Sequence, residues 1–274
     1  MRNDLTVNMD NNTLIISMTS WPKRIDKVAF AMYSIYRQLK NKNAKLVLVL
    51  AKPEFPNGLG DCPKALRQMV QSGVIELLWC ERNLFSHKKL MPTLGLFPNN
   101  PILVCDEDII RPDGWVDMFI NDHVIHPTDI LVGGCVFDIG FDGNTFNPTK
   151  LFKFDAPDCA GKVIKNRRPA NGFGGVLYPA GTFTDPRFYD IDNMMRLSRY
   201  SDESWQFCFN IIEGRTLRWT SKIYPYQYWQ QAGTYETSMS KARGNDKRDS
   251  YREIYERLFN EFPELREKLQ ARIQ

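Results

Sequence analysis

Three consecutive acidic residues, Asp106, Glu107 and Asp108, directly follow a short apolar run at residues 102–105. Such a run predicts a buried strand that carries the acids at its carboxyl end. Three neighbouring carboxylates repel one another and are costly to desolvate unless a cation compensates their charge. Mg²⁺ or Mn²⁺ suits this role, because both prefer carboxylate oxygens and Mg²⁺ is often shared with substrate phosphates. An acid cluster paired with Lys or Arg is the alternative to such a metal–phosphate site.

The first and third acids of the triplet are two residues apart, so on an extended chain their side chains point to the same side. Along an extended chain, Asp106 and Asp108 lie on one side and Glu107 on the other. One of the pair can then bind a metal directly, while the other accepts hydrogen bonds from a ribose or from a metal-bound water. A D-x-D pattern alone is weak, and its position at the end of a buried strand makes it more specific.

A second acidic pair, Asp202 and Glu203, follows Ser201 where a helix is expected to begin. Ser201 or Asp202 would cap this helix, and the helix dipole stabilises acids in the first turn. That structural explanation stands beside a functional one, in which an acid of the pair is a general base aimed into a crevice.

Two more segments could approach an anionic ligand. Three glycines within residues 171–178, among them Gly174 and Gly175, would let the backbone come close to a ligand, although a tight bulge explains them equally well. Lys88 and Lys89 stand at the expected start of a helix shortly before the acid strand. They could reach a pyrophosphate or form a solvated basic face.

The elements that would position these residues alternate between strand and helix. Apolar runs predict strands at 14–19, 45–51, 74–79 and 102–105, and helical spacing predicts helices at 28–40, 63–72 and 87–97. This alternation indicates right-handed βαβ crossovers and a mostly parallel sheet, in which ligands bind beyond the carboxyl ends of the strands. From residue 137 to 181 we expect long loops and short antiparallel strands. A helix is expected at 201–213, and an amphipathic helix or helix pair at 246–274.

Composition narrows the class of protein. The 274 residues are 43% apolar and 25% charged, as in an ordinary globular α/β protein. The net charge of +4 suits an anionic small ligand, and the chain shows no nucleic-acid-binding motif, so no nucleic-acid partner is expected. Six scattered cysteines without a C-x-x-C pair, and no signal-peptide pattern, point to a reducing cytoplasm.

Six segments, taken in order, together resemble one family. They are residues 16–25 (ISMTSWPKRI), 88–94 (KKLMPTL), 106–115 (DEDIIRPDGW), 172–181 (GFGGVLYPAG), 202–205 (DESW) and 245–246 (ND). The chain resembles bacterial GT-A-type glycosyltransferases of polysaccharide biosynthesis, which are found with capsule and lipopolysaccharide genes. It departs from the pattern at Glu107 and Glu203, where many relatives have Asp.

The resemblance implies an architecture. The fold would be an α/β GT-A (Rossmann-like) fold, with a mostly parallel central sheet flanked by helices and a loop-rich acceptor half. The catalytic domain would span 1–245, divided into a nucleotide-binding half at about 13–115 and an acceptor half at about 116–245. Residues 246–274 would form a helical extension. Its basic face could touch a membrane peripherally, or its apolar stripe could pack on the catalytic domain.

The resemblance also implies roles for individual residues. The partners would be a nucleotide-sugar donor, most often a UDP-sugar, and a saccharide or lipid-linked saccharide acceptor. Mn²⁺ or Mg²⁺ would be held by Asp108 and Asp106. Glu203 would be the base that deprotonates the acceptor hydroxyl, and direct attack of the acceptor on the anomeric carbon would invert its configuration. Asp202 would hold the donor sugar or the acceptor. The remaining expected contacts are Thr19, Ser20, Arg24, Lys89, Asp106 and Glu107 for the nucleotide, and Gly174 and Gly175 for the donor sugar.

Rival functions make different demands on the sequence. A sugar-1-phosphate nucleotidyltransferase usually opens with a glycine-rich loop, and residues 17–25 contain no glycine. A two-carboxylate glycoside hydrolase needs neither a metal nor an acid triplet at a strand end. A catalytically inactive nucleotide-sugar-binding protein is the non-enzyme alternative, and the retained acids at positions 106, 108 and 203 argue against it.

Overall fold

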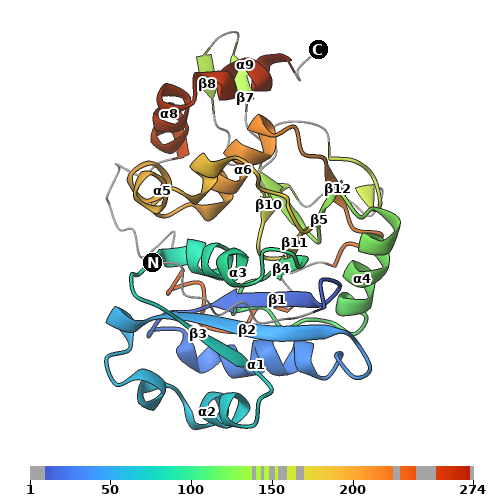
Figure 1. The fold of residues 1–274 in the computed structure, drawn as a ribbon, viewed down its shortest axis with the longest axis vertical. Helices are drawn as coiled ribbons and strands as arrows, with labels where there is room; N and C mark the ends of the chain where they lie inside the picture. The colour runs from blue at the N-terminus through green and yellow to red at the C-terminus, as the bar shows by residue number, and fades with distance from the viewer. Residues whose placement is uncertain are drawn as a thin grey trace.

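A computed structural model describes residues 10–137, 140–142, 145–147, 152–153, 159–164, 170–224, 229–238 and 251–271. At its centre is a seven-stranded sheet with the order β12-β5-β11-β4-β1-β2-β3 (Figure 1). The strands are β1 (Leu14–Thr19), β2 (Ala44–Ala51), β3 (Glu76–Cys80), β4 (Ile102–Val104), β5 (Ile130–Val132), β11 (Val176–Tyr178) and β12 (Leu217–Trp219). Every strand except β11 runs in the same direction, so the mostly parallel α/β sheet expected from the sequence is confirmed.

The order of the strands reverses beside β1. The chain moves outward from β1 to β2 and β3, and then returns to lay β4 along the other side of β1. Such a reversal leaves a crevice at the carboxyl ends of the two strands, which is where ligands bind in sheets of this kind. Residues 19–24 after β1 and the acid triplet after β4 therefore meet at one edge of the sheet.

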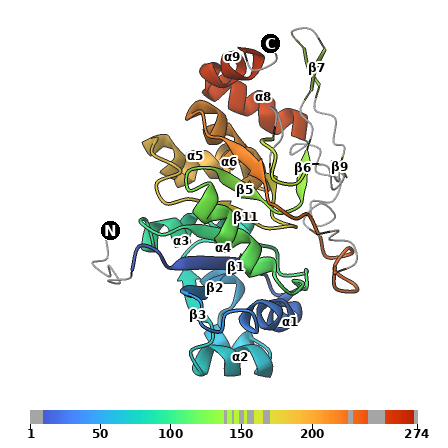
Figure 2. The ribbon, with the colours of Figure 1, turned by 90° about the vertical axis from the view of Figure 1, so that its right-hand side faces the viewer.

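The two faces of the sheet are covered by different helices (Figure 2). Alternate residues of each strand point to opposite faces, so Ile16, Leu48 and Leu103 belong to one apolar cluster and Ile15, Val49 and Val104 to another. The first cluster lies under α1 (Ile25–Tyr36), α2 (Lys64–Gln71) and α4 (Trp115–Ile125); the second lies under α3 (Met91–Leu96), α5 (Ile191–Ser198) and α6 (Asp202–Ile212). Burial on both faces explains why β2 reads as a nearly continuous apolar run.

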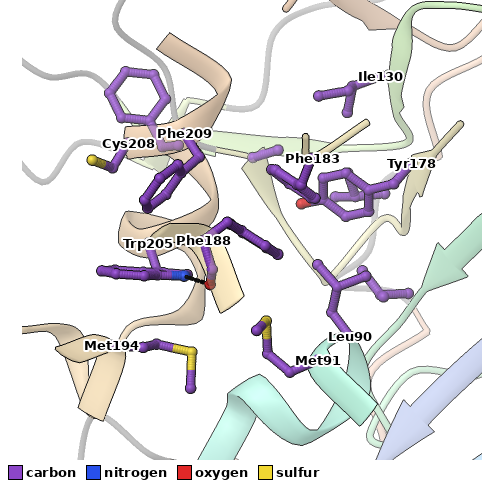
Figure 3. Close-up of a cluster of buried hydrophobic side chains, with 14 of the residues drawn as sticks. Leu90, Met91, Ile130, Tyr178, Phe183, Phe188, Met194, Trp205, Cys208 and Phe209 are labelled. Atoms are coloured by element: carbon purple, nitrogen blue, oxygen red, sulfur yellow. Dashed lines mark hydrogen bonds between the residues drawn. The ribbon is translucent and has the colours of Figure 1, made fainter. Parts of the chain in front are cut away.

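Aromatic packing fixes helix α6 over the sheet. Trp205 is completely buried, and its indole Nε1 donates a hydrogen bond of 3.0 Å to the carbonyl oxygen of Phe188 (Figure 3). Phe188 stacks on Phe183 with ring centroids 3.7 Å apart and contacts Phe209 edge-on at 5.4 Å. The Ser201 hydroxyl caps the helix by accepting a hydrogen bond from the Ser204 amide. The first turn of α6, with Asp202 and Glu203, is thus rigidly placed.

The C-terminal segment forms a helix pair that packs against the rest of the chain. Helices α8 (Tyr251–Glu261) and α9 (Pro263–Ala271) lie against α5 and α6. Their apolar stripe is buried: Ile254, Tyr255, Leu258, Phe259, Leu265 and Leu269. The stripe is therefore occupied by the protein's own core. Among the described residues, no helix is long and apolar enough to cross a membrane.

The remaining elements are short. There are two small antiparallel sheets. One contains β10 (Ala170–Asn171), β6 (Cys135–Phe137) and β9 (Phe152–Lys153), in that order, and the other pairs β7 (Gly140–Asp142) with β8 (Thr145–Asn147). The 3₁₀ helices within the described residues include η1 (Lys52–Glu54), η2 (Gly58–Asp61), η3 (Phe85–Lys89) and η5 (Pro186–Tyr189). The helix predicted at 87–97 is divided into η3 and α3, with Pro92 in the first turn of α3. The domain boundary predicted at residue 245 falls outside the described residues.

Candidate functional site

The acid triplet follows β4 in a turn rather than on an extended strand. The strand ends at Val104, and Glu107 and Asp108 form the turn. The expected alternation, with Glu107 opposite to the other two acids, is therefore wrong: Glu107 and Asp108 share one partner, and Asp106 has another. In this turn, the backbone N–H of Gln231 donates a hydrogen bond of 2.7 Å to the carbonyl oxygen of Asp108. This bond gives the Asp108 carbonyl a partner after the strand has ended.

Arg24 is the shared partner of the second and third acids. Its Nη1 lies 3.0 Å from Glu107 Oε1 and 3.4 Å from Asp108 Oδ2, and its Nε donates to Thr237 Oγ1 at 3.0 Å. Its Nη2 donates to the carbonyl oxygen of Thr234. The guanidinium group is buried, so it joins the loop after β1 to the acid turn and to residues 234–237. Its predicted contact with a nucleoside stays a prediction.

Burial and mutual repulsion raise the pKa values of the second and third acids of the turn. Burial, followed by the charge of Asp108, raises the pKa of Glu107 to about 7 against the opposing effect of Arg24. The pKa of Asp108 is also raised, first by burial and then by Asp106. Both directions indicate that the cations in place do not fully compensate the acids.

Lys89 is the partner of the first acid and links it to helix α6. Its Nζ lies 2.8 Å from Asp106 Oδ1 and 3.2 Å from Asp202 Oδ2, with the side chain only 8% exposed. Burial alone would lower the pKa of Lys89, but Asp106 and Asp202 raise it well above its usual value. The ammonium group is therefore charged, and it joins the two acidic motifs that the sequence places almost a hundred residues apart.

Asp202 is held in its ionised form. Burial alone would raise its pKa, but the charges of Lys89 and His87 bring it well below the usual range. Gln206, one turn along α6, donates its Nε2 to Asp202 Oδ2 at 3.4 Å and accepts a 2.7 Å hydrogen bond from the Tyr178 hydroxyl. An aspartate so strongly stabilised as an anion is a weak base and a good hydrogen-bond acceptor.

Glu203 faces a different neighbour. It is half-buried, and its Oε1 accepts a hydrogen bond from the hydroxyl of Tyr251 in α8. The structure thus places both acids of the pair at the start of α6 and gives them different environments, with a lysine beside Asp202 and a tyrosine beside Glu203.

The glycine segment is explained mainly by close backbone packing. A Cβ on Gly174 would lie 2.4 Å from the backbone of Gly133 and Gly134. Gly175 has a φ of +93°, and a Cβ there would lie 2.6 Å from Trp115. The predicted donor-sugar contact of Gly174 and Gly175 stays a prediction. Gly172 is the glycine at the site, because its Cβ would lie 2.6 Å from Asp106 Oδ1 and 2.9 Å from Lys89 Nζ.

The loop after β1 contributes one unsatisfied polar group. Thr19 donates its hydroxyl to the Val49 carbonyl at 2.7 Å, so its side chain is used within the sheet. Among the described residues, the hydroxyl of Ser20 is buried without a hydrogen-bond partner, while its carbonyl oxygen accepts from Lys88 at 3.2 Å. Ser20 thus retains bonding capacity for a ligand.

Residues 229–238 complete the site and carried no signal in the sequence. Gln230 donates its Nε2 to Asp108 Oδ2 at 3.2 Å, and Gln231 donates its Nε2 to the carbonyl oxygens of Glu107 and Lys27, each at 3.0 Å. This segment, which we call the acid-turn loop, covers two of the three acids. Glutamine and threonine side chains have no motif spacing that would identify them, and they reach the site only through the tertiary fold.

A divalent cation fits the acid turn if a ligand completes its coordination. Within the described residues, no three His, Cys, Asp or Glu side chains converge as a metal site. Asp108 Oδ1 is nevertheless buried with no hydrogen-bond partner in the part of the chain that the structure describes. The four carboxylates of Asp106, Glu107, Asp108 and Asp202 have only Arg24 and Lys89 as ion-pair partners among the described residues. Mg²⁺ is commonly bound by one or two carboxylates together with substrate phosphates, which matches this arrangement.

Comparison with known proteins finds likeness to solved structures. No protein-family model and no curated protein sequence matches this chain. TarS from S. aureus (residues 1–349) is similar in structure, with 12% identity and a TM-score of 0.49 over 90% of this chain and 72% of that one. A candidate nucleotide-diphospho-sugar transferase from Desulfovibrio desulfuricans G20 is similar with 11% identity and a TM-score of 0.41, over 94% of this chain and 98% of that one. The site itself therefore carries the functional assignment.

The close fit of Gly172 against the ion pair is testable. In Gly172→Ala, the added methyl group must displace Asp106 or Lys89, so we expect a loss of roughly 1–3 kcal/mol in the free energy of unfolding, as for other overpacked sites. Urea denaturation measures it. Gly95→Ala is the matched control, because a Cβ at Gly95 in α3 meets nothing within 4 Å. Equal stability of the two variants would contradict the packing described for Gly172.

Proposed function

We propose that this protein is a metal-dependent, inverting glycosyltransferase, which transfers a sugar from a nucleotide-sugar donor to a saccharide acceptor. The observation that carries the proposal is the meeting of two acidic motifs at the carboxyl edge of the sheet, joined by Lys89. One motif suits a nucleoside diphosphate with its cation, and the other suits the activation of a hydroxyl group. The place of the site, at the reversal of strand order beside β1, supports the same proposal.

In the proposed reaction, the nucleotide half binds and orients the donor. Asp108, with its unpartnered Oδ1, and Asp106 would hold Mn²⁺ or Mg²⁺; when bound, the ion neutralises charge that grows on the departing diphosphate. Ser20 offers its hydroxyl to the nucleoside portion. Arg24 and the acid-turn loop keep Glu107 and Asp108 in place, and Glu107 contributes to the nucleotide site through this arrangement.

The acceptor half supplies the proton chemistry. An acceptor hydroxyl oxygen forms a bond to the anomeric carbon while the bond from that carbon to the diphosphate breaks, and the electron pair leaves with the nucleoside diphosphate. Glu203 takes the hydroxyl proton, and attack from the opposite side inverts the anomeric configuration. Asp202 is the weaker base because Lys89 stabilises its anion, so it holds sugar hydroxyl groups as an acceptor.

The proposed setting is cell-surface polysaccharide biosynthesis in the cytoplasm, with a UDP-sugar as donor. A peripheral membrane contact would have to use charged side chains of the C-terminal helices, since their apolar stripe is buried against the core. A lipid-linked saccharide acceptor would suit such a contact.

Incubation with a panel of UDP-sugars and Mn²⁺, followed by an assay for free UDP, tests the activity. Release of UDP, faster with a saccharide acceptor, supports the proposal. Formation of a nucleotide sugar from a sugar 1-phosphate and a nucleoside triphosphate would show a nucleotidyltransferase. Binding of UDP-sugars without turnover would show a binding protein.

The metal role predicts a specific defect in Asp108→Ala. Transfer should be lost, and UDP affinity should fall in Mn²⁺ far more than in EDTA, because the variant lacks the carboxylate assigned to the ion. Isothermal titration calorimetry in the two buffers measures the difference. Asp113→Ala is the control, since this acid lies nearby on the surface, with its side chain 79% exposed. Unchanged activity and UDP affinity in Asp108→Ala would contradict the assignment.

The two acids of α6 should respond differently to loss of charge. Glu203→Gln keeps the shape and can still accept the Tyr251 hydrogen bond, so we expect kcat to fall by about 10²- to 10⁴-fold with donor binding nearly intact. Asp202→Asn should raise KM for donor or acceptor more than it lowers kcat. Steady-state kinetics separates the two. An inactive Asp202→Asn together with an active Glu203→Gln would reverse the assignment of the base.

A further inference from the structure

A tyrosine hydroxyl of helix α8 contacts Glu203, the proposed base. Tyr251, the first residue of the helix, donates its hydroxyl hydrogen bond to Glu203 Oε1. The sequence separates these residues by 48 positions, and the interpretation of residues 246–274 as a helical extension gave them no part in the site. The contact brings the C-terminal segment to the acidic pair of α6.

The position of Tyr251 is fixed by the packing of its helix. Ile254, Leu258 and Phe259 of α8 are buried, and Arg257 donates its Nε to the Leu197 carbonyl at 3.2 Å. Tyr255, one turn after Tyr251, is fully buried and its ring lies edge-on to that of Phe207 in α6, with centroids 6.2 Å apart. Two tyrosines of one helix face therefore contact α6, through Glu203 and Phe207.

Charged and titratable groups of three described elements interact with Glu203. Lys89 of η3 and Tyr178 of β11 lie close enough to interact with its charge, as does Tyr255 of α8. Its neighbour Asp202 lies against Lys89 at 3.2 Å. That ammonium group is shared between Asp106 and Asp202, and the hydroxyl of Tyr251 makes a direct hydrogen bond to the Glu203 carboxylate, which orients it.

We propose that Tyr251 is a positioning residue for Glu203, so that helix α8 forms part of the acceptor-activating half of the site. The inference rests on the proposed function, because it takes Glu203 as the base. A general base must reach the acceptor hydroxyl within hydrogen-bonding distance. A glutamate has one more rotatable bond than an aspartate at the same place, and the Tyr251 hydroxyl restrains that additional freedom. This requirement accounts for a tyrosine at the start of α8.

The variant Tyr251→Phe removes the hydroxyl and keeps the ring. We expect kcat to fall about 10-fold, as a hydrogen bond to a charged group is lost, while KM for the donor and UDP affinity are unchanged. The acidic limb of the kcat–pH profile should move to higher pH, because a donor that favours the ionised carboxylate is gone. Tyr189→Phe is the matched control. It removes the hydroxyl of a tyrosine in η5, which donates a hydrogen bond of 2.9 Å to the carbonyl oxygen of Phe183 and not to Glu203.

A second readout does not depend on activity. With ¹³C-labelled glutamate, and Glu203→Gln to assign the resonance, NMR titration of the Glu203 carboxyl should show its midpoint at higher pH in Tyr251→Phe than in the wild type and in Tyr189→Phe. Unchanged titration would overturn the inference even if the wild type transfers no sugar. If the wild type is active, an unchanged or increased kcat in Tyr251→Phe would overturn it too. A wild type that neither binds UDP nor transfers sugar would overturn the proposed function instead, and the titration would still decide whether Tyr251 acts on Glu203.

Discussion

The ammonium group of Lys89 holds the two halves of the site together. It lies between Asp106, at the end of the acid strand, and Asp202, at the start of α6. Removing one partner of a buried ion pair is strongly destabilising, because the other charge is left uncompensated. This three-residue cluster therefore ties the strand edge to the start of α6, and a Cβ on Gly172 would have to displace Asp106 or Lys89.

The acids around Lys89 differ in their environments, and these differences suit them to different roles in the proposed reaction. Glu107 and Asp108 share Arg24, yet Asp108 Oδ1 has no hydrogen-bond partner among the described residues. That is the condition for binding a further cation together with an anionic ligand. Asp202 is strongly stabilised as an anion by Lys89, whereas Glu203 contacts a tyrosine. A single ion-pair network can thus combine a cation-binding turn, a fixed hydrogen-bond acceptor and a candidate base.

The sequence predicted those features that depend on local pattern. The strand at 14–19 agrees with the structure, and the edge of the sheet follows from the alternation of strand and helix. Features that depend on distant contacts could not be predicted from the sequence. Gln230 and Tyr251 belong to no motif, although both contact an acid of the site. Lys89 was expected to contact a phosphate, and the structure places it between two carboxylates. The expected extended geometry of the triplet failed because a turn allows neighbouring acids to share one cation, which the pattern of apolar residues does not encode.

A double-mutant cycle between Lys89 and Asp202 tests the central claim most directly. The free energy of unfolding in urea is measured for the wild type, Lys89→Met, Asp202→Asn and the double variant. Residues in one ion-pair network are coupled by about 0.5–3 kcal/mol, and the short, buried contact between these two predicts a value in the upper half of that range. Additive effects of the two substitutions, with no coupling energy, would contradict the claim that Lys89 joins the acid turn to helix α6.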